Sequence, residues 1–152
     1  MNQPMLKLGI ASAIAATLFL ARTSAAADDS YQVTTTGAAA TVGTKAKADV
    51  TILAKKGWHL NAEAPLTLKL TPTPGVDVDR PKLGRADLAL STESTARFEV
   101  AMTASEPGKK AVAAEASFVL CQEESCRPIR EKLTLALDAT EAKVVKKPAK
   151  KK

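Results

Sequence analysis

The stretch 112–137, VAAEASFVLCQEESCRPIREKLTLAL, contains two apolar runs that flank a short polar segment. In the first run every second residue from Val112 to Leu120 is apolar, and the second run repeats this period at Leu133, Leu135 and Leu137. A period of two is typical of a β-strand with one buried face. The polar segment QEES, residues 122–125, therefore predicts the loop of a β-hairpin.

The register of this hairpin follows from the same alternation. If Cys121 lies opposite Cys126, then Phe118 lies opposite Ile129 and the apolar residues of both strands share one face. A slip of one residue would move one strand's apolar set to the other face, so the pattern favours this register independently of the cysteines. Opposed Cα atoms are about 4.5–5.5 Å apart, which is within disulfide range. A Cys121–Cys126 bridge is geometrically feasible.

Other runs with the same period lie outside the hairpin, and turn-forming segments separate them. These runs are 50–54, 66–70 and 98–102. No helical period of useful length accompanies them. Such strands bury their apolar faces most readily as two packed sheets. We therefore predict an all-β protein with an immunoglobulin-like antiparallel β-sandwich.

The first residues predict export. Lys7 precedes an apolar run over 8–21 that ends in small residues, which is the pattern of a secretory signal peptide spanning 1–26. The run is shorter than the roughly 20 residues that a membrane-spanning helix needs. We expect the signal to be cleaved, leaving no stable membrane anchor. The mature protein is then periplasmic or secreted, where cysteines can be oxidised.

The mature chain divides into three predicted parts. Residues 27–46 are small and polar and predict a flexible start, 47–140 form the immunoglobulin-like domain, and 141–152 form a disordered lysine-rich tail. An arm for anionic partners is the alternative interpretation of that tail. Without the tail and the signal, the 22 Lys and Arg fall to 14, against 16 Asp and Glu. We therefore expect no nucleic-acid partner.

The cysteine pair has two interpretations. A six-residue disulfide ring contributes roughly 2 kcal/mol in the chain-entropy model, against about 4.7 kcal/mol for a 100-residue loop. The register places the bridge at the hairpin tip, on the face opposite Phe118 and Ile129, where another protein could reach it. A weak and accessible bridge suits thiol–disulfide exchange. An ordinary structural disulfide in a non-catalytic exported binding or structural module remains the alternative.

The charged residues near the two cysteines differ. Glu123 and Glu124 follow Cys121 and disfavour a thiolate there, whereas Arg127 follows Cys126 and Arg130 lies nearby. Positive charge lowers the pKa of a thiol, so Cys126 is predicted to be the nucleophile of the reduced pair.

The segments KKGWHLNAEAPLTLKL (55–70), ASEPGKKAVAAEASF (104–118) and FVLCQEESCRP (118–128) resemble the amino-terminal domain family of the thiol:disulfide interchange protein DsbD. The resemblance runs from about residue 47 to residue 137. It implies a periplasmic immunoglobulin-like module that relays electrons through one cysteine pair. Cys121 and Cys126 would then be the catalytic pair of a thiol:disulfide oxidoreductase with no cofactor, acting on thioredoxin-like or other periplasmic thiol proteins. The oligomeric state is left open.

Other candidate sites are weaker. Trp58 and His59 are the single Trp and the single His, and no His, Cys or Asp spacing typical of a metal site surrounds them, so packing at a loop edge is expected. Asp77 and Asp79 lie in a segment rich in Pro and Gly, where a solvated loop is expected. Met102 is the single methionine outside the signal, which argues against a copper site.

Overall fold

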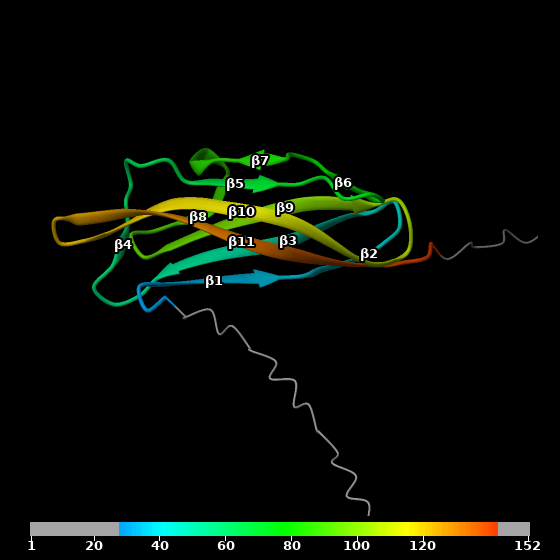
Figure 1. The fold of residues 1–152 in the computed structure, drawn as a ribbon. Helices are drawn as coiled ribbons and strands as arrows, with labels where there is room; N and C mark the ends of the chain where they lie inside the picture. The colour runs from blue at the N-terminus through cyan, green and yellow to red at the C-terminus, as the bar shows by residue number, and fades with distance from the viewer. Residues whose placement is uncertain (1–27, 143–152) are drawn as a thin grey trace, which may run out of the picture.

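Two β-sheets packed face to face form an immunoglobulin-like sandwich in the computed structural model, which describes residues 28–142 (Figure 1). The first sheet, sheet A, consists of β1 (Tyr31–Thr36), β3 (Lys45–Ala54), β9 (Thr95–Ala104), β6 (Val76–Val78) and β8 (Leu88–Ser91). The second, sheet B, consists of β2 (Ala38–Thr41), β11 (Ser125–Thr140), β10 (Gly108–Gln122), β5 (Thr67–Leu70), β7 (Lys82–Leu83) and β4 (His59–Leu60). The strand pairs are antiparallel apart from β2 and β11. The predicted fold class is confirmed.

The β10–β11 hairpin has the predicted register. Val112 pairs with Leu135, Phe118 with Ile129 and Cys121 with Cys126. The turn is shorter than predicted, because Gln122 and Ser125 still pair and only Glu123 and Glu124 connect the strands. Glu123 has a φ of 50°, a conformation that a two-residue hairpin turn often requires.

The core lies between the sheets and is built from the alternating residues. Their side chains point inward from both sheets, and the largest of those that are fully buried include Phe98, Ile52, Leu68, Leu120 and Leu135. Leu133 is half-buried, because none of the described strands pairs with this part of β11 on the edge away from β10. The apolar alternation therefore predicted the core well and overestimated burial at this edge.

The prediction of a flexible start over 27–46 is wrong for most of that range. Strand β1 pairs with β3 and strand β2 pairs with β11, so this segment supplies an edge strand to each sheet. The chain changes sheets at Gly37, where a Cβ atom would lie 3.2 Å from the backbone oxygen of Ala136. Backbone hydrogen bonds to a neighbouring strand hold these edge strands, and a few alternate residues, among them Tyr31, Val33 and Ala38, pack in or against the core.

The predicted signal peptide, 1–26, and nearly all of the lysine-rich tail lie outside the described residues. Within 28–142 no helix has the length and apolar character needed to cross a membrane.

Candidate functional site: the disulfide at the tip of the β10–β11 hairpin

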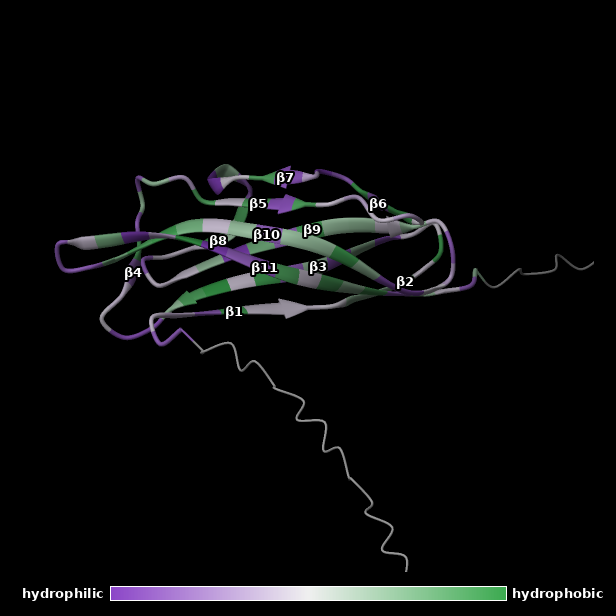
Figure 2. Ribbon diagram, viewed as in Figure 1, coloured by the Kyte–Doolittle hydropathy of each residue, from purple (hydrophilic) through white to green (hydrophobic). Residues whose placement is uncertain are grey.

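The two cysteines form a disulfide next to the hairpin turn. Their sulfur atoms are 1.97 Å apart and their Cα atoms 4.0 Å apart, which confirms the predicted pairing. In Figure 1 this end of the β10–β11 hairpin projects beyond the other strands. Figure 2 shows that the tip is hydrophilic, so the bridge lies beside a polar, solvent-facing turn.

The two sulfur-bearing residues differ in exposure. Cys126 is exposed, whereas only 3% of Cys121 is accessible to solvent. The sequence predicted an accessible bridge on the outer face, and this holds for Cys126 alone. Cys121 is covered because β4 extends sheet B at this point, with His59 opposite Cys121 and Leu60 opposite Leu120. A partner can therefore reach the bridge from the Cys126 side.

Asn61 contacts the buried sulfur. Its Nδ2 donates a hydrogen bond to Cys121 Sγ at 3.5 Å. Its Oδ1 accepts hydrogen bonds from the backbone N–H groups of Glu63 (2.8 Å) and Ala64 (3.0 Å), which orients the amide with its N–H groups toward the sulfur. Arg85 holds the same turn by donating to the backbone oxygens of Asn61 and Ala64, at 2.7 and 2.8 Å.

The sequence-based reasoning did not identify Asn61 or Arg85. Asn61 lies in the GWHLNAEAP segment that carries part of the family resemblance, and an Asn that starts a turn was a local signal for it. Nothing in the sequence linked Arg85 to this turn, because the two lie 24 residues apart.

The predicted role of Arg127 in stabilising a Cys126 thiolate is wrong. Arg127 pairs with Leu120, so its side chain lies on the opposite face of the hairpin from Cys126. Its guanidinium donates to both carboxylate oxygens of Asp28, at 2.8 and 2.9 Å, and to Ser30 Oγ. It also lies 4.8 Å from the centre of the Trp58 ring, within the range of a cation–π contact.

Arg130 does share the outer face with Cys126, but the two lie four positions apart along an extended strand. That spacing corresponds to about 13 Å, which is more than the Debye length at physiological ionic strength. The difference between the two sulfurs therefore comes from exposure and from Asn61.

The Asp28 carboxylate has a pKa below its usual value of 3.8. The hydrogen bonds from the Ser30 hydroxyl and backbone N–H are the main cause, and the bond and charge of Arg127 add to them. The contacts among Asp28, Ser30 and Arg127 hold the residues before β1 against β11 near the hairpin tip.

Trp58 and His59 lie beside the site. Trp58 is half-buried against the core beneath Arg127, which agrees with the predicted packing role, whereas His59 is exposed in β4. Asp77 lies in β6 and Asp79 pairs with Lys45, so this segment is more ordered than the predicted loop. Between residues 28 and 142 no group of three or more His, Cys, Asp or Glu is placed to hold a metal ion.

Together, the fold and the site define an immunoglobulin-like β-sandwich with a cross-strand disulfide at the tip of its longest hairpin. No protein-family model matches the sequence, and no curated protein matches it.

Solved structures with a similar arrangement of strands share little sequence with this chain. The major subunit AggA of aggregative adherence fimbriae type I from Escherichia coli is 12% identical, with a TM-score of 0.38 over 72% of this chain and 94% of that one. WR4, an MSP family member from C. elegans, is 9% identical, with a TM-score of 0.38 over 71% and 97%. A PapD-like domain of human CEP192 is 11% identical, with a TM-score of 0.36 over 91% and 99%. At these values the comparisons assign no function.

Proposed function

We propose that the protein is an exported thiol–disulfide exchange module that transfers electrons to or from partner thiol proteins through the Cys121–Cys126 bridge. One observation carries the proposal: the bridge presents the exposed Cys126 sulfur, while the other sulfur is buried and hydrogen-bonded. The resemblance of residues 47–137 to the DsbD amino-terminal domains supports the same chemistry and a periplasmic location.

The exposure of Cys126 supports one order of the exchange steps. A partner thiolate attacks Cys126 Sγ, the Cys121–Cys126 bond breaks, and its electron pair stays on Cys121 Sγ as the leaving thiolate. A second thiolate of the partner then attacks the partner's own sulfur in the mixed disulfide and releases Cys126 as a thiolate. The partner dithiol is oxidised to a disulfide and the bridge is reduced by two electrons. The reverse sequence oxidises the module.

Asn61 supports the first step. A leaving thiolate departs faster when its charge is stabilised, and Asn61 Nδ2 already faces Cys121 Sγ. The buried position of Cys121 also keeps competing thiols away from it, so mixed disulfides should form on Cys126.

The test measures the reduction potential of the bridge in glutathione redox buffers and the reactivity of each single thiol. We expect a potential above about −300 mV, the level below which structural disulfides typically lie. We also expect Cys121→Ser to leave a Cys126 thiol that forms a mixed disulfide with an oxidised thioredoxin-like protein, and Cys126→Ser to form far less. A potential well below that level, together with two equally unreactive thiols, would reject the exchange function.

A non-catalytic exported immunoglobulin-like binding or structural module is the second candidate. The specific observation that favours it is the engagement of Arg127 with Asp28, which leaves Cys126 without the adjacent cation that activates many redox cysteines. In that case the bridge only fastens the hairpin tip. The same measurement of reduction potential separates the two candidates.

A further inference from the structure

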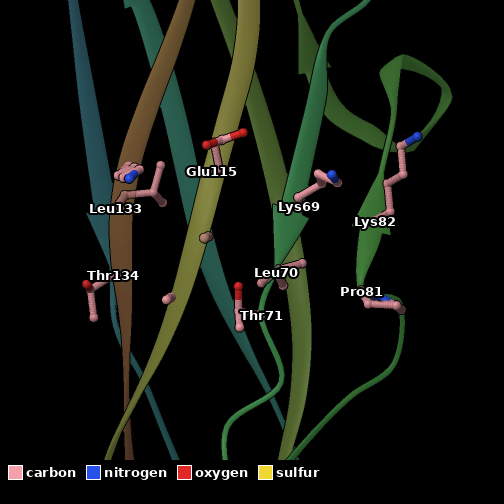
Figure 3. Close-up of a pocket in the computed structure, with 11 residues that line it drawn as sticks. Lys69, Leu70, Thr71, Pro81, Lys82, Glu115, Leu133 and Thr134 are labelled. Atoms are coloured by element: carbon pink, nitrogen blue, oxygen red, sulfur yellow. The ribbon is translucent and has the colours of Figure 1, made fainter.

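The outer face of sheet B carries a row of charged residues that crosses four strands. Lys132 on β11 lies opposite Glu115 on β10, Glu115 lies opposite Lys69 on β5, and Lys69 lies opposite Lys82 on β7. Figure 3 shows Glu115, Lys69 and Lys82 side by side on neighbouring strands. The row borders an open groove of about 740 Å³, whose other lining residues include Thr71, Pro81, Ala113 and Thr134.

These lysines lack the partners that lysines on the other sheet have. On sheet A, Lys45 pairs with Asp79 and Lys47 pairs with Glu99. Among the described residues, no carboxylate lies within 4.0 Å of the ammonium groups in the row. All three lysines are exposed.

The placement of Lys69 opposite Lys82 costs stability. Like charges directly opposite each other on neighbouring strands repel, and a carboxylate at position 82 would remove the repulsion, whereas one at position 69 would face Glu115. Residues that lower stability without a structural benefit are typical of binding sites. The row therefore fits a site for a ligand that supplies the missing negative charge.

Glu115 narrows the chemistry of that ligand. A half-buried carboxylate in the middle of the row repels a uniformly anionic polymer and accepts hydrogen bonds from N–H groups. An acidic peptide provides both carboxylates and backbone N–H donors. Side chains on one face of an extended peptide are about 6.8 Å apart along the peptide. The neighbouring strands that carry the lysines are about 4.8 Å apart, and a lysine side chain is long enough to bridge the difference. The groove volume is also within the roughly 300–1,000 Å³ of ligand pockets.

We infer that this groove binds an extended acidic segment of a partner protein, with its carboxylates on Lys69, Lys82 and Lys132. The inference does not depend on the exchange function. Cys126 and Lys132 lie on the same face of β11, six residues and about 20 Å apart. A standard interface covers about 800 Å² on each partner, which is a disc of about 16 Å radius, so a protein centred on the groove would end short of the bridge.

The experiment measures the affinity of the full chain for a fluorescein-labelled peptide of alternating Glu and Ser, by anisotropy at low ionic strength. The double variant Lys69→Glu/Lys82→Glu is expected to bind about tenfold more weakly, because two attractions become repulsions. The matched control is Lys56→Glu/Arg97→Glu, which changes the net charge equally at exposed positions that do not line the groove and should change the affinity less than about twofold. The lysine tail is present in every variant.

A stability measurement accompanies the binding assay. Lys82→Glu alone should raise the midpoint of urea unfolding while it weakens peptide binding, because it removes the repulsion with Lys69. Equal loss of affinity in the control variant would show that net charge or the tail binds the peptide, and would overturn the inference. A sulfated oligosaccharide that binds more tightly than the peptide, with the same dependence on Lys69 and Lys82, would also overturn it in favour of an anionic polymer. A lower urea midpoint for Lys82→Glu would show that Lys69 and Lys82 do not destabilise the fold by repulsion, and would contradict the reason given for a binding site there.

Discussion

The two sulfur atoms of the bridge have different surroundings because three segments meet at the hairpin tip. Asn61 follows β4 and donates to Cys121 Sγ, while Cys126 lies on β11 facing solvent. Arg127, the residue next to Cys126, points to the other face and binds Asp28. At the residue scale, access and one hydrogen bond, rather than a neighbouring cation, distinguish the sulfurs.

Replacing Asn61 tests its role toward the leaving sulfur. Asn61→Ala should slow reduction of the bridge by dithiothreitol about tenfold, because a hydrogen bond to a charged group contributes about 1.5 kcal/mol. The measurement is the rate of reduction under pseudo-first-order conditions. Glu63→Ala is the control, since Asn61 Oδ1 binds the Glu63 backbone N–H and not its side chain. Equal rates for the two variants and the wild type would contradict a role for Asn61.

The Asp28–Arg127 pair predicts an acid-sensitive contribution to stability. The pKa of Asp28 is lowered in the folded protein, so its contribution is present above the unfolded value of 3.8 and is lost as the pH falls through the folded pKa. Wild type should therefore be more stable than Asp28→Asn at neutral pH, and the difference should shrink below pH 3.8. Urea unfolding across that range measures it. A difference that does not vary with pH would mean that charge is not its source.

At the scale of elements, the β10–β11 hairpin is the longest strand pair of sheet B, and its two strands lie in the interior of that sheet. Its register is held mainly by apolar residues that face sheet A, and Arg127 and Glu131 interrupt that row on β11. The disulfide adds a constraint at the tip, where the two-residue turn already holds the strands together. The bridge is therefore expected to matter less for stability than the core pairs do.

Removing the bridge tests this expectation. The double variant Cys121→Ala/Cys126→Ser should lose no more than about 2 kcal/mol of unfolding free energy, which is the entropic contribution of a six-residue ring. Ala at 121 avoids burying an unpaired hydroxyl. Denaturant unfolding of both proteins gives the value. A loss well above about 3 kcal/mol, in the upper range for native disulfides of small secreted domains, would favour the structural function of the bridge.

At the scale of the whole molecule, the two sheets share one core, whose residues all lie between residues 30 and 140 in the part of the chain that the structure describes. Among the described strands none pairs with the edge of β11 over residues 125–136, because β2 pairs only with Leu137–Thr140. Pro128 and a run of charged residues, Arg130, Glu131 and Lys132, occupy this edge. Such residues discourage edge-to-edge association of strands.

The predicted tail remains to be tested by truncation. Deleting residues 143–152 should leave the melting temperature almost unchanged, because β11 ends at Thr140 before the deletion begins. Differential scanning calorimetry of the full and truncated chains measures the effect. Substantial destabilisation would show that the lysine-rich segment packs on the sandwich.

The sequence by itself determined the fold class, the main strands and the register of the cysteine hairpin. These follow from a local period of two, and the hairpin partners are close along the chain, so the pattern of two adjacent runs was sufficient. The same pattern failed for β1 and β2, because each has only two core-facing apolar residues and its pairing also depends on backbone hydrogen bonds to β3 or β11.

Only the tertiary structure decided what surrounds each site residue. Asp28 reaches Arg127 across 99 residues of sequence, and Asn61 reaches Cys121 across 60. The lysine row joins β5 and β7 to the β10–β11 hairpin, from which they are separated along the chain. Side-chain partners of this kind depend on which strands become neighbours and which face each side chain takes. That choice is made by packing the whole sandwich, so no local pattern in the sequence could reveal it.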